Sequence, residues 1–323
     1  MTTGGTIATV TTPHGTTAPE ASPETLISAL PEDLQPVRVE ERAPMPSWAF
    51  GPDDMISIAL RAREIARDHQ DLAGLVVTHG TSTMEYTAYL TELFLDTEFP
   101  VVFTGAMRSA DDADGDGPGN LRDACTLARV PGAGRLGVVI CLNGEVLSAR
   151  DAHKRHRHDR VAFADLRGRV GTVSGGQVLI VRQPVRAPAL TGVIDPSVAI
   201  VKAYPGSDGS VVDAVVARGA RGVVVEGLPG VGGIPVAMQD ALRRHAGTGV
   251  LIVISSRAPS GHVPSPPTGG TGEPLAGMGL LSAGSLTTEK AWVLLMACLG
   301  QSEGEEAARL FAEVSQIETG EEA

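Results

Sequence analysis

Two glycine turns that carry hydroxyl side chains, and one of very few lysines, are the groups in this sequence that could do chemistry together. The turns are residues 3–6 (Thr-Gly-Gly-Thr) and 78–83 (Thr-His-Gly-Thr-Ser-Thr), and the lysine is Lys154. A threonine hydroxyl becomes a nucleophile when a base takes its proton, and a desolvated, neutral lysine can be that base, whereas an arginine stays charged. Backbone amides in the glycine turns can hold an oxyanion. This set predicts catalysis by a threonine nucleophile.

The second turn follows the apolar run 72–77 and precedes a segment in which Met84, Ala88 and Leu95 share one helical face. This pattern predicts a buried strand, a polar turn and a helix. Turns at the carboxyl edge of a parallel sheet commonly bind ligands, because the helix amides converge there. Helix capping accounts for one or two of the polar side chains but not for five of six, so we interpret the turn as a site.

Further strands and helices alternate along the chain. Proline residues at 184, 188 and 196 interrupt this pattern. We therefore predict an α/β protein with mainly parallel sheets, made of an N-terminal domain (1–182), a linker (183–197) and a C-terminal domain (198–323). The predicted strands are 37–40, 101–105, 136–143, 199–203, 222–226 and 250–255, with a hairpin over 170–181. The predicted helices start at Pro23 and Asn120 and span 52–68, 210–217, 237–245 and 286–298.

The composition describes a globular protein without nucleic-acid or membrane partners. The chain has 323 residues, 42% of them hydrophobic, and a net charge of −12. This charge disfavours nucleic acid and anionic membrane surfaces, and no run approaches the ~20 apolar residues of a membrane span. Three cysteines in apolar contexts and the lack of a basic-then-apolar signal segment predict a reduced, cytoplasmic protein. The chain begins directly on a glycine turn, so either its first strand is very short or the true start lies upstream.

Two clusters invite a metal interpretation. Asp112, Asp114 and Asp116 resemble the start of a calcium loop, but a strand precedes them and Pro118 occupies the turn. The histidines within 153–158 do not have the spacing of the usual zinc sites, and no cysteine is near. We interpret the acidic loop as structural and predict no metal and no cofactor.

Several motifs in sequence order resemble the bacterial-type L-asparaginase/glutaminase family. They are residues 3–8 (TGGTIA), 79–81 (HGT), 83–85 (TME), 105–108 (GAMR), 116–118 (DGP), 120–121 (NL) and 255–257 (SSR). The resemblance implies a larger N-terminal and a smaller C-terminal α/β domain. It also implies a homodimer or homotetramer in which each site is completed by the neighbouring subunit. The implied reaction is hydrolysis of a side-chain amide to acid and ammonia, without a cofactor.

By position, Thr6 matches the nucleophile of the family, and Thr81 and Lys154 match two members of its Thr-Lys-Asp set. Ser47 matches the serine that holds the substrate carboxylate. The resemblance further implies that main-chain groups of four small residues line the pocket: Gly4, Gly5, Gly80 and Ala106.

Two departures from the family pattern bear on the substrate. The pattern is His-Gly-Thr-Asp-Thr, and here Ser82 occupies the aspartate position, where the family places the contact to the substrate α-ammonium. A neighbouring acid such as Asp151 is a candidate replacement. The tyrosine of the N-terminal loop is also missing, since the first tyrosine is Tyr86 and Thr16 or Thr17 lies in that region.

Two hypotheses follow. The first is an amidohydrolase for which L-asparagine is the default substrate, with Ser82 favouring an amide whose α-amino group is absent or modified. The second is a catalytically silent relative that binds a small amino acid or amide.

Overall fold

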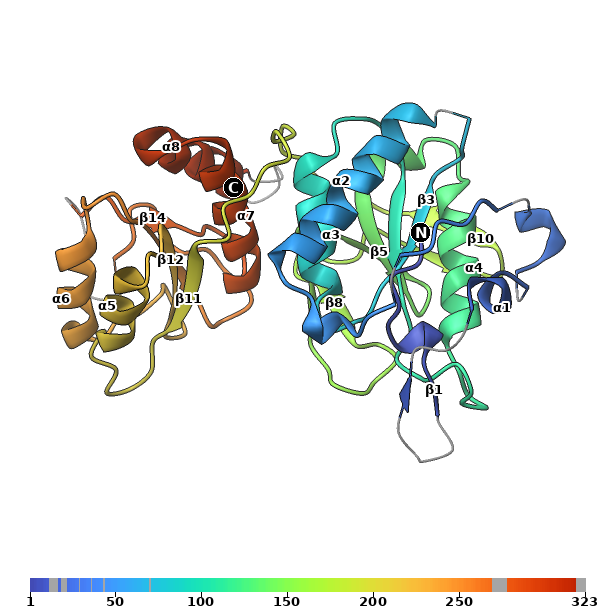
Figure 1. Cartoon of the computed structure of the whole chain (residues 1–323), viewed down its shortest axis with the longest axis horizontal. Helices are drawn as coiled ribbons and strands as arrows, with labels where there is room; N and C mark the ends of the chain where they lie inside the picture. Colours follow the sequence, from blue (N-terminus) through green and yellow to red (C-terminus); the bar gives the residue numbers. More distant parts are fainter. Residues whose placement is uncertain are drawn as a thin grey trace. The chain divides into compact units, whose positions relative to one another are not determined.

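The computed structural model describes residues 1–11, 17–18, 22–28, 30–35, 37–42, 44–69, 71–268 and 278–317. The chain divides into two compact units, Met1–Arg186 and Ala187–Ala323 (Figure 1). Each unit combines a β-sheet with helices, so the predicted two-domain α/β class is confirmed. The predicted linker, 183–197, stays a prediction. No helix in the described ranges is long and apolar enough to cross a membrane.

The larger unit is built on a six-stranded sheet of order β10-β9-β6-β5-β4-β3. Its strands are β3 (Leu75–Thr78), β4 (Val101–Thr104), β5 (Val138–Leu142), β6 (Glu145–Ser148), β9 (Gly171–Ser174) and β10 (Gln177–Ile180). Strands β3, β4 and β5 are parallel, and the other three neighbouring pairs are antiparallel. The sheet is therefore mixed. It reverses direction because Asn143 and Gly144, with φ of 50° and 72°, form a two-residue hairpin turn between β5 and β6.

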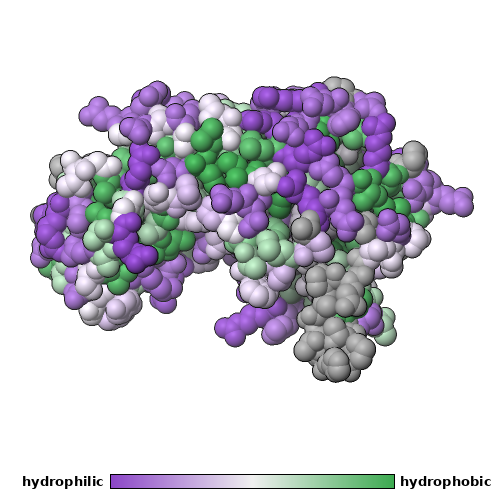
Figure 2. Space-filling view, viewed as in Figure 1, coloured by the Kyte–Doolittle hydropathy of each residue, from purple (hydrophilic) through white to green (hydrophobic). Residues whose placement is uncertain are grey.

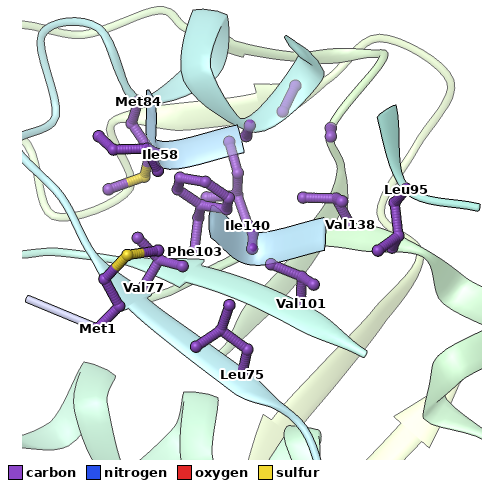
Figure 3. Packing of buried hydrophobic residues seen from close by; sticks show 14 of the residues in the cluster. Met1, Ile58, Leu75, Val77, Met84, Leu95, Val101, Phe103, Val138 and Ile140 are labelled. Carbon is purple, nitrogen blue, oxygen red and sulfur yellow. The ribbon is translucent and has the colours of Figure 1, made fainter. Parts of the chain in front are cut away.

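Helices cover both faces of this sheet. Helices α2 (Pro52–Asp68) and α3 (Met84–Phe94) lie on one face, and α4 (Gly117–Ala128) lies on the other (Figure 1). Side chains alternate along β4, so Val101 and Phe103 pack under α2 and α3, as Figure 3 shows, while Val102 packs under α4. Burial on both faces explains why these strands are continuous apolar runs.

Shorter elements complete the larger unit. They are η1 (Thr6–Ala8), β1 (Val10–Thr11), β2 (Thr17–Ala18), α1 (Pro23–Ser28), η2 (Glu32–Leu34), η3 (Ser47–Ala49), η4 (Ala133–Leu136), β7 (Ala152–Lys154) and β8 (Phe163–Asp165). Strands β7 and β8 form a separate antiparallel ribbon.

Two sequence predictions in this unit need correction. Residues 37–40 are not a strand, because the pairing there is limited to a bridge between Thr2 and Glu41. Thr2 also bridges to Thr78, so the chain begins with a very short pairing beside β3. Helix α4 starts at Gly117 rather than at Asn120, because Pro118 occupies its first turn, where a missing N–H costs little.

The smaller unit has a four-stranded parallel sheet of order β11-β12-β13-β14. Its elements are β11 (Val198–Lys202), α5 (Ser210–Ala217), β12 (Gly222–Gly227), α6 (Val236–His245), β13 (Leu251–Ser256), β14 (Leu281–Ser282), α7 (Thr288–Gln301) and α8 (Gly304–Ser315). Aliphatic side chains from β12, β13 and α6 form its core. On the face seen in Figure 2, hydrophilic residues surround small apolar patches.

Arg186 anchors the end of the larger unit to α3. Its Nε donates to the Glu92 carboxylate across 2.8 Å, and another guanidinium nitrogen donates to the carbonyl of Leu95 at 2.8 Å. Burial raises the pKa of Glu92, and the charge of Arg186 opposes this shift. The chain therefore leaves the larger unit from a fixed point.

Candidate active site

Lys154 and Thr81 meet in a direct hydrogen bond. Thr81 lies in the turn between β3 and α3 and is 6% exposed, and Lys154 ends β7. The Lys154 Nζ donates to the Thr81 Oγ1 across 2.7 Å. Since β7 pairs with β8, with Lys154 opposite Phe163, the ribbon holds the lysine in place beside the turn.

Partial burial shifts the pKa of this lysine. Desolvation lowers the pKa of Lys154 below its usual value, and the negative charge of Glu85 opposes that shift. A lower pKa increases the fraction of neutral amine at a given pH, which is what a general base requires.

Glu85 is the carboxylate that acts on Lys154, and sequence reasoning assigned it no role. It lies in the first turn of α3 and is 9% exposed. The signal that could have found it is an acid two residues after Thr83, at the start of the helix that follows the threonine turn. Asp151, the acid that sequence reasoning suggested, contacts two arginines. Its carboxylate pairs with Arg150 at 2.8 Å and contacts Arg167 at 3.6 Å.

The two glycine turns touch each other. A Cβ added to Gly5 would lie 2.5 Å from both the Cα and the N of Gly80, so neither a side chain nor water separates the two backbones. Gly5 has φ of +89°, a conformation that favours glycine. Thr6 follows directly in η1 and is partly exposed. The structure thus brings the turn of Thr6 against the turn of Thr81.

Ser47 packs on the same turn. A Cβ at Gly80 would lie 2.4 Å from the Ser47 Oγ, and the Thr83 hydroxyl donates to the Ser47 carbonyl across 2.8 Å. Ser47 is 3% exposed, while its neighbour Trp48 is 75% exposed. These contacts fix the serine beside the glycine turn although 33 positions separate Ser47 from Gly80 (80 − 47).

The remaining predicted pocket residues differ in their surroundings. Ser82 is exposed, next to Thr81. Ala106 is 1% exposed and belongs to an apolar cluster with Ile7. Gly4 has φ of +91°, and a Cβ there would lie 2.8 Å from the backbone N of Met45. Thr16 lies outside the described residues.

His79 is buried and holds the backbone of the turn after β3 through a hydrogen bond. Its Nδ1 donates to the Gly80 carbonyl at 2.8 Å, and its ring packs edge-on against Phe50 with centroids 5.0 Å apart. Complete burial lowers the pKa of His79 to about 4, so the imidazole is neutral at pH 7. The Nε2 has no hydrogen-bond partner within the described part of the chain.

The acidic loop has structural contacts. Asp116 accepts hydrogen bonds from the backbone amides of Met107 and Arg108, and from the side chain of Asn120. Asp114 pairs with Arg160 at 2.7 Å. Among the described residues, no group of three or more His, Cys, Asp or Glu side chains is arranged to hold a metal ion.

Two family models, several known proteins and a solved structure match this chain over most of its length. Residues 1–186 match the family model "Asparaginase, N-terminal", and residues 197–311 match "Glutaminase/Asparaginase C-terminal domain". A probable L-asparaginase of Deinococcus radiodurans is 33% identical, over 95% of this chain and 94% of its own length. L-asparaginase 2 of Escherichia coli K12 is 31% identical, over 94% and 88%. The crystal structure of a probable cytoplasmic L-asparaginase from Campylobacter jejuni superimposes with a TM-score of 0.85 at 30% identity, covering 97% of this chain and 98% of that one.

Proposed function

Because this chain belongs to the asparaginase family, whose members are amidohydrolases, we propose that it hydrolyses a small carboxylate-bearing amide to the acid and ammonia. The observation that carries the proposal is the hydrogen bond from Lys154 to Thr81, in a half-buried setting that lowers the lysine pKa. A general base needs both a nearby hydroxyl and a lowered pKa, whereas an ordinary surface lysine needs neither.

In the proposed reaction, the Oγ of Thr6 attacks the amide carbon and its proton passes to the Thr81–Lys154 pair. The carbon–nitrogen bond then breaks, and the returned proton leaves with ammonia. Water hydrolyses the resulting ester and regenerates the hydroxyl, so the cycle balances without a cofactor. Backbone groups of Gly5, Gly80 and Ala106 line the pocket and stabilise the developing oxyanion.

Ser47 holds the substrate carboxylate, and Ser82 shapes the choice of substrate. Ser82 is neutral, so it offers a substrate ammonium no charge. L-asparagine is the default substrate, and the neutral serine favours amides such as succinamate, which lack the α-amino group.

The test is ammonia release from a panel of amides with and without α-amino groups, for the wild type and Thr6→Ala. We expect turnover by the wild type and a loss of at least about 100-fold in Thr6→Ala. The proposal fails if no amide yields ammonia. Thermal stabilisation by the same amides without turnover would instead identify a catalytically silent binding protein, which is the second candidate.

We further propose that the protein is cytoplasmic and forms a homodimer or homotetramer whose sites are completed by the neighbouring subunit. The similarity to family members of nearly equal length over almost the whole chain supports this assembly. Light scattering after size-exclusion chromatography gives the mass that tests it, and a monomer at assay concentration would overturn it.

A further inference from the structure

A cavity of about 250 Å³ lies within the larger unit, between β6 and β8. Four charged residues line it: Glu145, Arg155, Asp165 and Arg169. Leu147 and Phe163 form an apolar part of its wall. None of these residues belongs to the candidate active site.

The two acids and the two arginines of this lining are not paired with one another in equal measure. Asp165 has its side chain fully buried and accepts hydrogen bonds from Ser148 and Arg182. The Asp165 carboxylate is therefore already paired and does not neutralise a second arginine. Arg169 and Glu145 are only loosely paired, at 3.6 Å.

Because Asp165 is paired with Arg182, Arg155 is left without a carboxylate partner on the described stretches of the chain. Its side chain is exposed, and its guanidinium has no hydrogen-bond or ion-pair partner among the residues that the structure describes. The cavity thus combines one unpaired guanidinium with one weakly paired guanidinium, in a protein whose net charge is −12. The planar fork of arginine matches the oxygens of carboxylates and phosphates, so an oxyanion is the ligand chemistry that fits.

Arg155 and Lys154 project from opposite sides of the β7–β8 ribbon, although Phe163, the cross-strand partner of Lys154, also lines the cavity. Arg155 directly follows Lys154, and its backbone N–H donates to Ala162 at 2.8 Å, which continues the β7–β8 ribbon by one residue. Since side chains alternate between the two sides of such a ribbon, Arg155 projects on the side opposite to Lys154. A ligand of Arg155 would therefore touch the ribbon that carries the lysine without occupying the active site.

We propose that this cavity is a second binding site, for a small oxyanion held between the guanidinium groups of Arg155 and Arg169. Both a carboxylate and a phosphate have oxygens that suit these guanidinium groups, and the experiment distinguishes between the two anions.

Isothermal titration calorimetry of the full chain with succinate, and separately with inorganic phosphate, tests the proposal at an ionic strength held constant with chloride. We expect saturable binding with a Kd of about 1 mM or tighter for at least one of the two anions. The anion with the lower Kd shows whether the site prefers a carboxylate or a phosphate. Because the readout is binding, the result does not depend on whether the protein turns over an amide.

Three variants locate the bound anion. Arg155→Gln and Arg169→Gln should each weaken binding by about tenfold or more, because each removes a charge-assisted pair of hydrogen bonds. Arg157→Gln is the matched control, because Arg157 is also exposed and lies two residues away but does not line the cavity. The Kd of this variant should not change.

Three results would overturn the proposal. The first is no saturable binding up to about 10 mM of either anion. The second is an equal loss in Arg157→Gln, which would mean diffuse attraction by the basic loop. The third is loss of all binding in Ser47→Ala while Arg155→Gln and Arg169→Gln leave the Kd unchanged, which would place the only bound anion in the active site.

Discussion

The Lys154 ammonium reaches the Thr81 hydroxyl at 2.7 Å although the two residues are 73 positions apart. Two independent elements produce this contact, the turn after β3 and the β7–β8 ribbon. The lysine amine is thereby held within hydrogen-bonding distance of the threonine hydroxyl.

Replacing Lys154 should abolish most of the activity. A general base contributes about 10²–10⁴-fold to the rate, so Lys154→Met should lower kcat by that range. Lys154→Arg should lose a similar factor, because a guanidinium does not become neutral. Steady-state ammonia release measures both variants. Lys202→Met is the control, since that lysine is an exposed partner of Glu226 in the other unit, and a comparable loss there would contradict the assignment.

The pH dependence of the activity should follow Lys154. If the neutral amine is the base, kcat/KM rises with pH through the lysine pKa, which burial has lowered. Because Glu85 raises that pKa, Glu85→Gln should move the rising limb to lower pH. A pH profile of kcat/KM over pH 5–10 measures the midpoint, and an unmoved or upward-shifted limb would count against the role of Glu85.

Much of the fold follows from local pattern. The predicted helix 52–68 matches α2, and the predicted hairpin over 170–181 contains β9 and β10, because apolar periodicity and turn residues agree there. The reversal at Asn143-Gly144 was missed although this dipeptide is a strong hairpin signal. The ribbon of β7 and β8 was missed because each strand has only three residues, too few to show a period.

The sequence predicted which residues belong to the candidate site, but it did not predict how their side chains interact. The identities of Thr81 and Lys154 came from residue chemistry and family resemblance. The influence of Glu85 on Lys154 required coordinates, because no sequence spacing relates α3 to β7. The contact between Asp151 and Arg167 likewise depends on tertiary structure.

Ser82→Asp should improve the hydrolysis of L-asparagine. A carboxylate beside Thr81 would gain a charge-assisted contact to the α-ammonium, which is worth about one to two decades in KM. Ser82→Asn is the matched control, because it has nearly the same shape as aspartate without the charge. Kinetics with L-asparagine and with succinamate separate the effects, and an equal gain on both substrates would show that charge recognition is not the cause.

Gly80→Ala should displace Ser47. The new Cβ would lie 2.4 Å from the Ser47 Oγ and 2.7 Å from its Cβ, so η3 has to move, at a cost of about 1–3 kcal/mol in the free energy of unfolding. If Ser47 holds the substrate carboxylate, as proposed, KM should also rise. Gly119→Ala is the control, because that glycine lies in α4 with nothing within 4 Å of an added Cβ, and urea unfolding should show equal or higher stability there.

His79 should make the stability fall in mild acid. Its pKa drops from 6.5 to about 4 on folding, so between these pH values the unfolded chain binds a proton that the folded chain does not. The free energy of unfolding therefore decreases as the pH falls through this window, by about 2 kcal/mol between pH 7 and 5 from this group. Urea unfolding at both pH values measures it. His79→Asn keeps a donor near the Nδ1 position but does not titrate, so a pH dependence as steep as that of the wild type would contradict this source.

The Arg186 anchor also marks where this protein can be recombined with its relatives. Because the guanidinium is bound to Glu92 and to the end of α3, a chimaera that keeps residues 1–186 from this chain retains both partners of the buried pair. A crossover placed a few residues earlier would take residue 186 from the other parent, and Glu92 would lose its partner wherever that parent has no arginine there. Domain grafting within the family thus has a natural junction directly after this residue.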